Sequence, residues 1–254
     1  MSKLISSGQK SAAPAIDAGV LILELLATAT HSLTLTEISH LSGIPAASVY
    51  RIVKALLAKQ MLAIDPRRKK SYTIGAKVFE LTASIYHRQR IIPFFYPVAE
   101  ILKNEIHKSI FLCVPVGSNV VVIAKLDYSF NHSAELFIGQ TFSICQSAGG
   151  KAILSRMDKA VSDEYLQIEF ADKDAVEQQE LSDQLARAAR LGYALDATLA
   201  DRQSCIAAPV VNEHNEPIAA ICAVVNAPHI DPSQARQYSK NLIQAVRQLS
   251  ARIL

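Results

Sequence analysis

The chain lacks the features that mark membrane, secreted and zinc-binding proteins. It has no run of 18 apolar residues, which excludes a membrane-spanning helix, and its N-terminal stretch lacks the continuous apolar core of a secretory signal. The four cysteines, Cys113, Cys145, Cys205 and Cys222, form neither a C-x-x-C pair nor a Cys/His cluster at zinc spacing. We therefore expect a cytoplasmic chain with reduced thiols in apolar strands, no bound metal and no cofactor.

The net charge is small but unevenly distributed. The sequence carries 26 Lys and Arg against 23 Asp and Glu, a formal net charge of +3. Residues 1–90 hold 12 cations and 5 anions, or +7, whereas residues 91–254 hold 14 and 18, or −4. A basic head on an acidic body is the electrostatic pattern of a DNA-binding domain attached to a second domain. A chain of 254 residues, half of them apolar, is long enough for two such units.

Residues 34–55 have the pattern of two short helices joined by a tight turn. Thr34 stands three residues ahead of Glu37, which is a capping box, and Gly43 ends the first helix. A second helix starts at Pro45, and its apolar residues recur at helical spacing: Val49, Ile52, Val53, Leu56 and Leu57. Its other face would offer small residues, a phenol and two cations to a DNA major groove: Ala46, Ala47, Ser48, Tyr50, Arg51 and Lys54. An αα-hairpin that serves only as scaffold is the alternative.

A short hairpin with a basic tip follows the two helices. MLAI at 61–64 and SYTIG at 71–75 read as paired strands around DPRRKK. Four adjacent cations stand at the tip and repel one another unless phosphate or water neutralises them: Arg67, Arg68, Lys69 and Lys70. This predicts the wing of a winged helix-turn-helix, with a solvated basic loop as the alternative. Residues 1–13, with Lys3 and Lys10, are expected to form a disordered arm.

The remainder of the chain predicts a linker helix and an α+β or α/β body. The linker helix runs from about Ala76 to Gln89, with an apolar face that needs a partner in the body or in a second subunit. Pro93 and Pro97 mark the crossing into the body. The expected strands are 111–116, 120–127, 134–138, 205–211 and 218–226 in a mixed sheet, and the expected helices are 98–107, 150–157, 176–190 and 232–253.

Taken together, these segments resemble the IclR family of transcriptional regulators over nearly the whole chain. The resemblance is carried, in the family's order, by LTLTEISHLSGIPAASVYRIVKALLAKQML, YTIGAKVFELT, SAGGKAIL, LGYALD and CIAAPVVNEHNEPIAAICAVVNAP. It implies a winged helix-turn-helix at 14–75, a linker helix at 76–92 and a GAF-like mixed α/β effector-binding domain at 93–254. It also implies a homodimer or dimer of dimers, away from any membrane, that binds double-stranded operator DNA under the control of a small organic acid or related metabolite.

The family's motifs assign the effector pocket to seven residues: Ser147, Gly149, Gly150, Asp196, Cys205, Cys222 and Asn226. The two glycines precede a helix, where backbone N–H groups would receive a carboxylate, or they only start that helix. Asp196 would bond a hydroxyl or a water, or would be an exposed loop residue. Cys205 and Cys222 would line the cavity or only fill the core. After Asp196 the family's acidic pair is missing and Arg202 stands near a usual glycine, so the identity of the ligand does not transfer.

A thiol-dependent hydrolase or acyl-transfer enzyme is the alternative function. Cys145 with His132, or Cys205 with His214, would supply the thiol and the base, and glycines 149 and 150 would supply an oxyanion hole. No nucleophile motif surrounds either cysteine, and an enzyme would leave the basic helix-turn-helix without a purpose. The sequence therefore predicts a DNA-binding regulator and not an enzyme.

Overall fold

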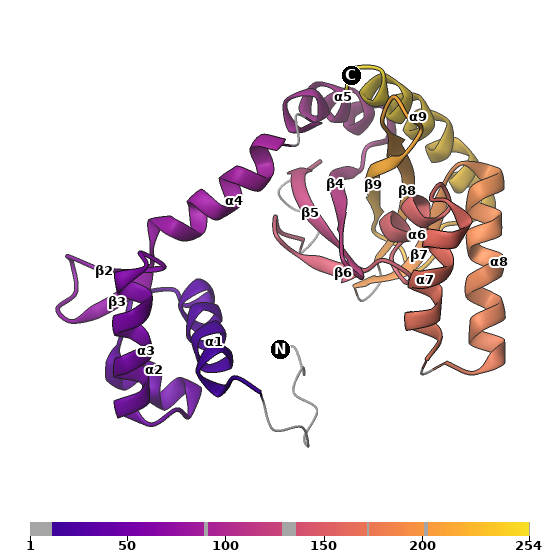
Figure 1. Ribbon diagram of the computed structural model, residues 1–254. Helices are drawn as coiled ribbons and strands as arrows, with labels where there is room; N and C mark the ends of the chain where they lie inside the picture. The colour runs from indigo at the N-terminus through magenta and orange to yellow at the C-terminus, as the bar shows by residue number, and fades with distance from the viewer. Residues whose placement is uncertain (1–11, 89–90, 129–135, 172, 201–202, 254) are drawn as a thin grey trace. The chain divides into compact units, whose positions relative to one another are not determined.

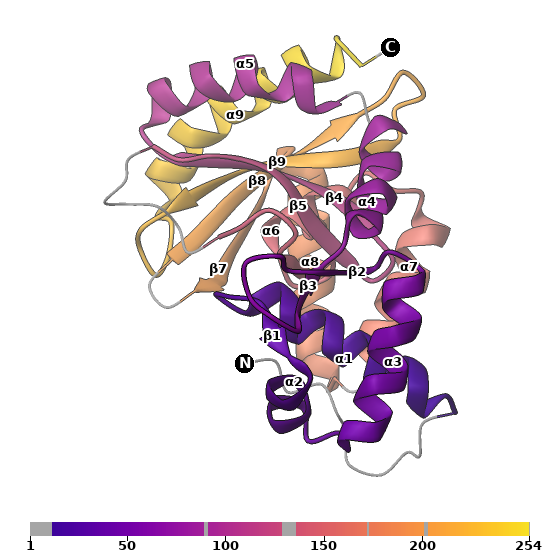
Figure 2. The ribbon, with the colours of Figure 1, turned by 90° about the vertical axis from the view of Figure 1, so that its left-hand side faces the viewer.

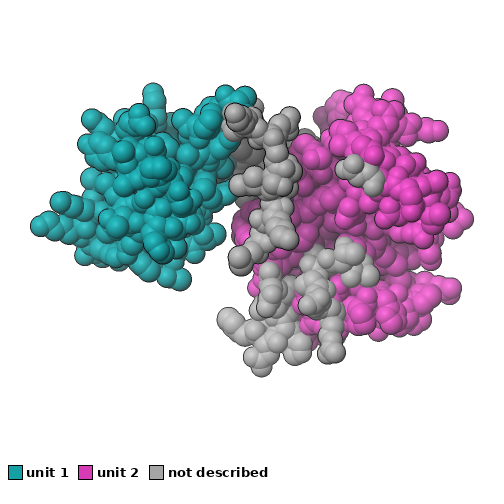
Figure 3. Space-filling model, turned by 90° about the horizontal axis from the view of Figure 1, so that it is seen from below, with its two compact units in different colours: residues 1–89 teal, residues 90–254 magenta. Residues whose placement is uncertain are grey.

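The computed structural model describes residues 12–88, 91–128, 136–171, 173–200 and 203–253. The chain divides into two compact units, Met1–Gln89 and Arg90–Leu254 (Figure 3). Among the described residues no single helix is long and apolar enough to cross a membrane, although the bent pair Leu35–Ser42 and Ala46–Ala58 passes that test by length and composition. The arm residues Lys3 and Lys10 lie outside the described residues, as do His132 and Arg202.

The first unit is a helical bundle against a small sheet (Figure 1). Its elements are α1 (Pro14–Thr28), β1 (Leu33–Thr34), α2 (Leu35–Ser42), α3 (Ala46–Ala58), β2 (Leu62–Ile64), β3 (Ser71–Ile74) and α4 (Ala76–Arg88). The antiparallel strands lie in the order β1-β3-β2. Apolar residues from α1, α2, α3, β1 and β2 are buried together: Ile22, Leu26, Leu33, Ile38, Val49, Val53 and Leu62. The predicted helix-turn-helix and wing hairpin are confirmed, whereas α1 and β1 were not predicted.

Local signals set the bounds of α2 and α3. The side chain of Thr34 accepts a hydrogen bond from the backbone of Glu37, and Glu37 accepts one from the backbone of Thr34, which completes the predicted capping box. Gly43 ends α2 with a φ of 69°, a left-handed conformation that favours glycine. The predicted start of α3 is one residue early, because Pro45 is extended and serves as the N-cap of a helix that begins at Ala46.

The second unit is a six-stranded sheet with helices on both faces (Figure 1 and Figure 2). Its strands are β4 (Ser109–Val116), β5 (Asn119–Leu126), β6 (Thr141–Ser143), β7 (Ala194–Ala200), β8 (Gln203–Val211) and β9 (Pro217–Val225). They lie in the order β6-β5-β4-β9-β8-β7. Both predicted hairpins are confirmed. All of these pairings are antiparallel, so the prediction of mixed strand directions is wrong and the class is α+β.

Two sets of helices cover the sheet. The helices α5 (Ile91–Ile106) and α9 (Pro232–Ser250) lie side by side on one face, and α6 (Ala148–Leu154), α7 (Lys159–Phe170) and α8 (Ala175–Leu191) lie on the other (Figure 1). Leu242, Val246 and Leu249 form the buried stripe of α9, whereas Ile253, which helical spacing also places on that stripe, lies beyond the helix end at Ser250. Every residue of α6 is buried, because this short helix is enclosed between the sheet and α8.

Several predictions for the second unit are wrong. Pro93 and Pro97 lie inside α5, which begins at Ile91, so they do not mark a crossing between elements. The predicted strand at 134–138 is partly outside the described residues, and 136–138 form no strand, because only Leu136 of these apolar residues is buried. The strand that pairs with β5 at this edge of the sheet is β6 instead. The predicted helix at 150–157 starts earlier and ends earlier, as α6, and both α7 and β7 were not predicted.

Candidate DNA-binding surface and ligand pocket

One face of α3 anchors the helix and the other meets solvent. Val49 and Val53 are buried in the core of the first unit. Of the residues predicted to face DNA, Ser48 is half-buried and the other five are exposed: Ala46, Ala47, Tyr50, Arg51 and Lys54. Within the described residues, neither Arg51 nor Lys54 takes part in an ion pair, which leaves both cations available to a partner.

The four cations of the wing are not equivalent. Lys69 and Lys70 are exposed, and the side chain of Arg67 is 91% exposed and bonded only to Asp65 of the same turn. Arg68 instead reaches back to the helix-turn-helix, where its guanidinium donates to Glu37 Oε1 at 2.6 Å and to the backbone carbonyl of Ser32. The sequence did not predict this, because the partners of Arg68 lie more than 30 residues earlier in the chain.

Glu37 connects three parts of the helix-turn-helix. One carboxylate oxygen accepts hydrogen bonds from the backbone N–H and the hydroxyl of Thr34, at 2.7 and 2.9 Å, and the other accepts from Arg68. The backbone bond from Thr34, and then the bond from Arg68, lower the pKa of Glu37 to about 2. This carboxylate therefore stays ionised at neutral pH and fixes the wing to the start of α2.

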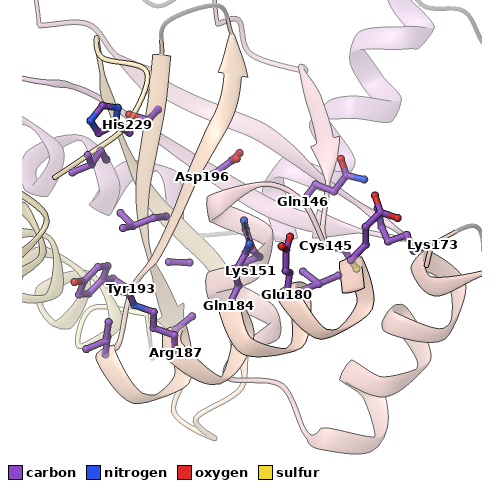
Figure 4. A pocket seen from close by; sticks show the side chains of 18 residues that line it. Cys145, Gln146, Lys151, Lys173, Glu180, Gln184, Arg187, Tyr193, Asp196 and His229 are labelled. Atoms are coloured by element: carbon purple, nitrogen blue, oxygen red, sulfur yellow. Dashed lines mark hydrogen bonds between the residues drawn. The ribbon is translucent and has the colours of Figure 1, made fainter. Parts of the chain in front are cut away.

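A pocket of about 540 Å³ opens on the α6 face of the second unit (Figure 4). Its walls come from α6, α8, β7, β8 and the connecting segments that carry Cys145, Lys173, Tyr193 and His229. Eleven of its 18 lining residues are polar or charged: Gln146, Lys151, Lys173, Glu177, Glu180, Gln184, Arg187, Tyr193, Asp196, Ser204 and His229. A cavity of this size accommodates a small organic molecule.

Lys151 and Asp196 are the buried charges of the pocket. Lys151, on α6, is 6% exposed, and its Nζ donates to Gln184 Oε1 on α8 at 2.8 Å. Burial lowers the pKa of Lys151, and the negative charges that Asp196 and Cys205 can carry oppose that shift. Asp196 lies on β7 opposite Cys205 of β8 and is 8% exposed, so the alternative of an exposed loop aspartate is wrong.

Two glycines before Lys151 allow α6 to approach the rest of the second unit closely. A Cβ on Gly149 would stand 2.5 Å from Cys113 Sγ and 3.1 Å from Cys222 Sγ. A Cβ on Gly150 would stand 2.0 Å from the backbone oxygen of Ile144. These positions require glycine because there is no space for a side chain.

Family models match both units of the chain. The model of the IclR helix-turn-helix domain matches residues 15–66, and that of the C-terminal domain of bacterial IclR transcriptional regulators matches residues 83–251. The chain belongs to the IclR family of bacterial transcriptional regulators. It is 22% identical over 239 residues to the transcriptional repressor IclR of Escherichia coli K12, covering 91% of this chain and 87% of that protein.

Solved structures of other IclR proteins share the fold. The Thermotoga maritima IclR structure has a TM-score of 0.73 at 18% identity and covers 94% of this chain and 98% of its own. An IclR homolog from Microbacterium hydrocarbonoxydans, solved with 4-hydroxybenzoate, has a TM-score of 0.72 at 18% identity and the same coverage. The predicted architecture, a winged helix-turn-helix followed by a C-terminal domain of helices and sheet, is thus confirmed as that of the IclR family.

The structure gathers only part of the predicted effector site of this IclR-family chain. Asp196 lines the pocket, and Cys205 is its buried neighbour on β8. Cys222 lies deeper, with its Sγ 3.7 Å from that of Cys113, so it belongs to the core. Asn226 stands beyond the end of β9, where it is exposed and accepts a hydrogen bond from Gln203.

The sequence predicts that backbone N–H groups at the start of α6 face the pocket, but the structure does not place them there. The hydroxyl of Ser147 caps the helix by accepting from the Gly150 N–H, and it donates to the carbonyl of Ser143 at 2.8 Å. Gly149 and Gly150 pack against sulfur and backbone atoms. The next residue, Lys151, carries the polar group that reaches the pocket. Lys151 stands in the SAGGKAIL motif. Its contact with Gln184 depends on the packing of α8 against α6, so no local sequence pattern could have predicted it.

The alternative enzyme is not supported by the geometry or the family. Burial, and then the charge of Glu169, raise the pKa of the Cys145 thiol to about 11, which makes it a weak nucleophile at neutral pH. Cys205 is buried, whereas His214 lies in the exposed turn after β8. The strand from Cys205 to the end of β8 spans roughly 20 Å at about 3.3 Å per residue, which keeps the thiol and the imidazole apart. The matched families and relatives are transcriptional regulators.

Proposed function

We propose that this IclR-family regulator binds operator DNA through α3 and the wing, and that a small organic acid in the pocket of the second unit changes its operator affinity. The observation that carries the DNA-binding part is the division of α3 into an anchored face and an exposed face with Tyr50, Arg51 and Lys54. A helix of this kind can enter a major groove while the rest of its unit contacts phosphates.

The wing adds phosphate contacts next to α3 in this proposal. Arg67, Lys69 and Lys70 are exposed, and a cation that neutralises a phosphate releases a condensed counterion. In this proposal Arg68 holds the hairpin in place and does not contact DNA, since its guanidinium already donates hydrogen bonds to Glu37 and to the carbonyl of Ser32.

The effector part of the proposal rests on the pocket. It combines a buried ammonium with a buried carboxylate, and these two groups suit a ligand with a carboxylate and a hydroxyl. The M. hydrocarbonoxydans homolog was solved with a ligand of that class, 4-hydroxybenzoate. A homodimer or dimer of dimers is part of the proposal as well, because Phe79 and Leu81 on α4 are 70% and 50% exposed and would be covered by a second subunit.

The DNA-binding part is tested with Arg51→Ala. The full chain is titrated with the intergenic DNA beside its own gene and with a random duplex of equal length. Loss of a base contact is expected to reduce the preference for the specific duplex by about 1–3 kcal/mol. Lys59→Ala is the control, because Lys59 is an exposed cation at the opposite end of α3. Unchanged binding of Arg51→Ala to both duplexes would remove α3 as the recognition helix.

The regulatory part is tested on the same operator with and without small acids. An effector is expected to change operator affinity by about 1–3 kcal/mol, since it can do so only by binding the DNA-competent and incompetent states unequally. If none of the acids changes the affinity of a chain that binds its operator, the second unit is a platform for assembly and not a sensor.

A further inference from the structure

Lys151 is a buried ammonium whose direct partner is a neutral amide. Lysine is among the residues least often buried, because its charge loses hydration there. Its Nζ donates to Gln184 Oε1, and among the described residues no carboxylate lies within 4.0 Å of it. An amide oxygen balances an ammonium less well than an anion does, since hydrogen bonds between two charged groups are stronger than those to neutral groups.

The two partners differ in their surroundings. Lys151 is held at the floor of the pocket by a helix of which every residue is buried. Gln184 belongs to α8, is exposed, and stands at the pocket wall beside it (Figure 4). An amide that leaves Lys151 therefore finds water at once, whereas the ammonium is held at the pocket floor by a buried helix and needs another acceptor within the pocket.

We propose that Lys151 is the anion-recognition group of the pocket and that the carboxylate of a monoanionic hydroxy acid displaces Gln184 from it. This inference rests on the proposed function and names the ligand class of that site. Asp196, on the adjoining strand, accepts the hydroxyl of the ligand and disfavours a second negative charge. One negative charge and one hydroxyl donor thus match the two buried charges of the pocket.

Displacement of Gln184 also provides a route for the signal. The Lys151–Gln184 bond joins α6 to α8 across the pocket. When a carboxylate takes the place of the amide, this direct link between the two helices is replaced by a link through the ligand. The ligand then changes the position of α8 relative to α6, because both helices contact the ligand instead of each other at this point.

The experiment compares each acid with its amide on the full chain. The probes are lactate, 3-hydroxybutyrate and 4-hydroxybenzoate, and their controls are lactamide, 3-hydroxybutyramide and 4-hydroxybenzamide. Thermal shift at millimolar concentration selects a binder, and calorimetry then measures its Kd. At least one acid is expected to raise the melting temperature, while its amide, which has the same shape without the charge, does not. No shift with any acid, or equal shifts for acids and amides, would overturn the proposal.

Two variants test the residues. Lys151→Met is expected to weaken binding of the selected acid about 10- to 100-fold, the loss that follows from removing a charge-assisted hydrogen bond. Gln184→Leu is expected to tighten binding several-fold, because it removes the competitor and leaves the ammonium in place. The two changes thus have opposite signs, which a general loss of folding does not produce.

A matched lysine serves as the control. Lys103→Met removes a lysine whose side chain is 15% exposed and which pairs with Glu100 on α5, on the other face of the sheet, so acid binding should not change. Equal binding by wild type and Lys151→Met, or weaker binding by Gln184→Leu, contradicts the proposed displacement. These readouts need no DNA. A neutral compound that changes operator affinity would leave the regulatory function standing while it overturned this assignment.

Discussion

Replacement of Gly149 by alanine tests whether the glycine pair of α6 exists for packing or for ligand contact. The new methyl group would stand 2.5 Å from Cys113 Sγ, where an ordinary contact is about 3.5–4.0 Å, so the overlap is about 1 Å or more. Cys113 has no room to retreat, since it is fully buried and its Sγ lies 3.7 Å from that of Cys222. Forcing a methyl group into a packed core of this kind costs about 1–3 kcal/mol.

The cost is measured by differential scanning calorimetry of the full chain, following the transition of the second unit. For a unit of this size, 1 kcal/mol lowers the melting temperature by about 2–4 °C, so Gly149→Ala should lower it by about 2–12 °C. Cys113→Ala removes the sulfur that the new methyl group meets. The double variant should therefore be more stable than the sum of the two single changes indicates, by about 1–2 kcal/mol.

A related substitution provides the control. Gly150→Ala places its Cβ 2.0 Å from the backbone oxygen of Ile144, which no change of a cysteine can relieve, so Cys113→Ala should not rescue it. If Gly149→Ala instead keeps the wild-type melting temperature and only weakens acid binding, the glycine serves the ligand and the packing argument is refuted.

Three further outcomes follow from the contacts described. Arg67→Ala should reduce the slope of log operator affinity against log salt concentration by about 0.9, because it removes one phosphate contact. Arg68→Ala should lower operator affinity mainly by releasing the wing from Glu37. Equal changes of slope in the two variants would contradict these different roles. The pKa of Glu37 is lowered to about 2 from an ordinary value near 4.5, so the stability that its ionised carboxylate gives the folded chain is complete above pH 4.5 and is lost as pH falls towards 2. The difference in melting temperature between wild type and Glu37→Gln should shrink over that range. A constant difference would argue against the ion pair. In calorimetry, Asp196→Asn should weaken the binding of hydroxy acids about 10-fold more than the binding of acids without a hydroxyl, while operator binding without effector stays intact. Equal losses for the two kinds of acid would remove Asp196 as the hydroxyl acceptor.

Elements whose signals are local could be predicted from the sequence. The capping box of Thr34 and Glu37, the left-handed Gly43 and the alternating wing strands each depend on a few adjacent residues, and all were found. The helix α7 was missed because its apolar residues, such as Val161 and Ile168, are partly exposed and form no clear stripe. The strand β7 was not predicted because its sequence, ALDATLA, has only one β-branched residue and no aromatic residue, the types that are enriched in strands.

The candidate site could be predicted only where local sequence spacing alone determines which way a side chain faces. Arg51 and Tyr50 lie on the exposed face because helical spacing alone determines it. The roles of Arg68 and Lys151 depend on contacts with residues more than 30 positions away, which no local pattern records. The family's motifs led to Asp196, which lines the pocket, but also to Asn226, which lies beyond the end of β9 and outside the pocket.

The complete burial of α6 restricts how a pocket of this kind can acquire a new ligand. Each of its seven residues is packed on all sides, so substitutions at the floor are paid for in stability before they alter recognition. The wall opposite is tolerant, because Arg187, Glu180 and His229 face solvent as well as the cavity. Under the proposed function, divergent effector preferences are therefore expected on that outer wall, around an unchanged Lys151 ammonium. A library that seeks a biosensor for a different acid is therefore best confined to α8, Tyr193 and the segment around His229.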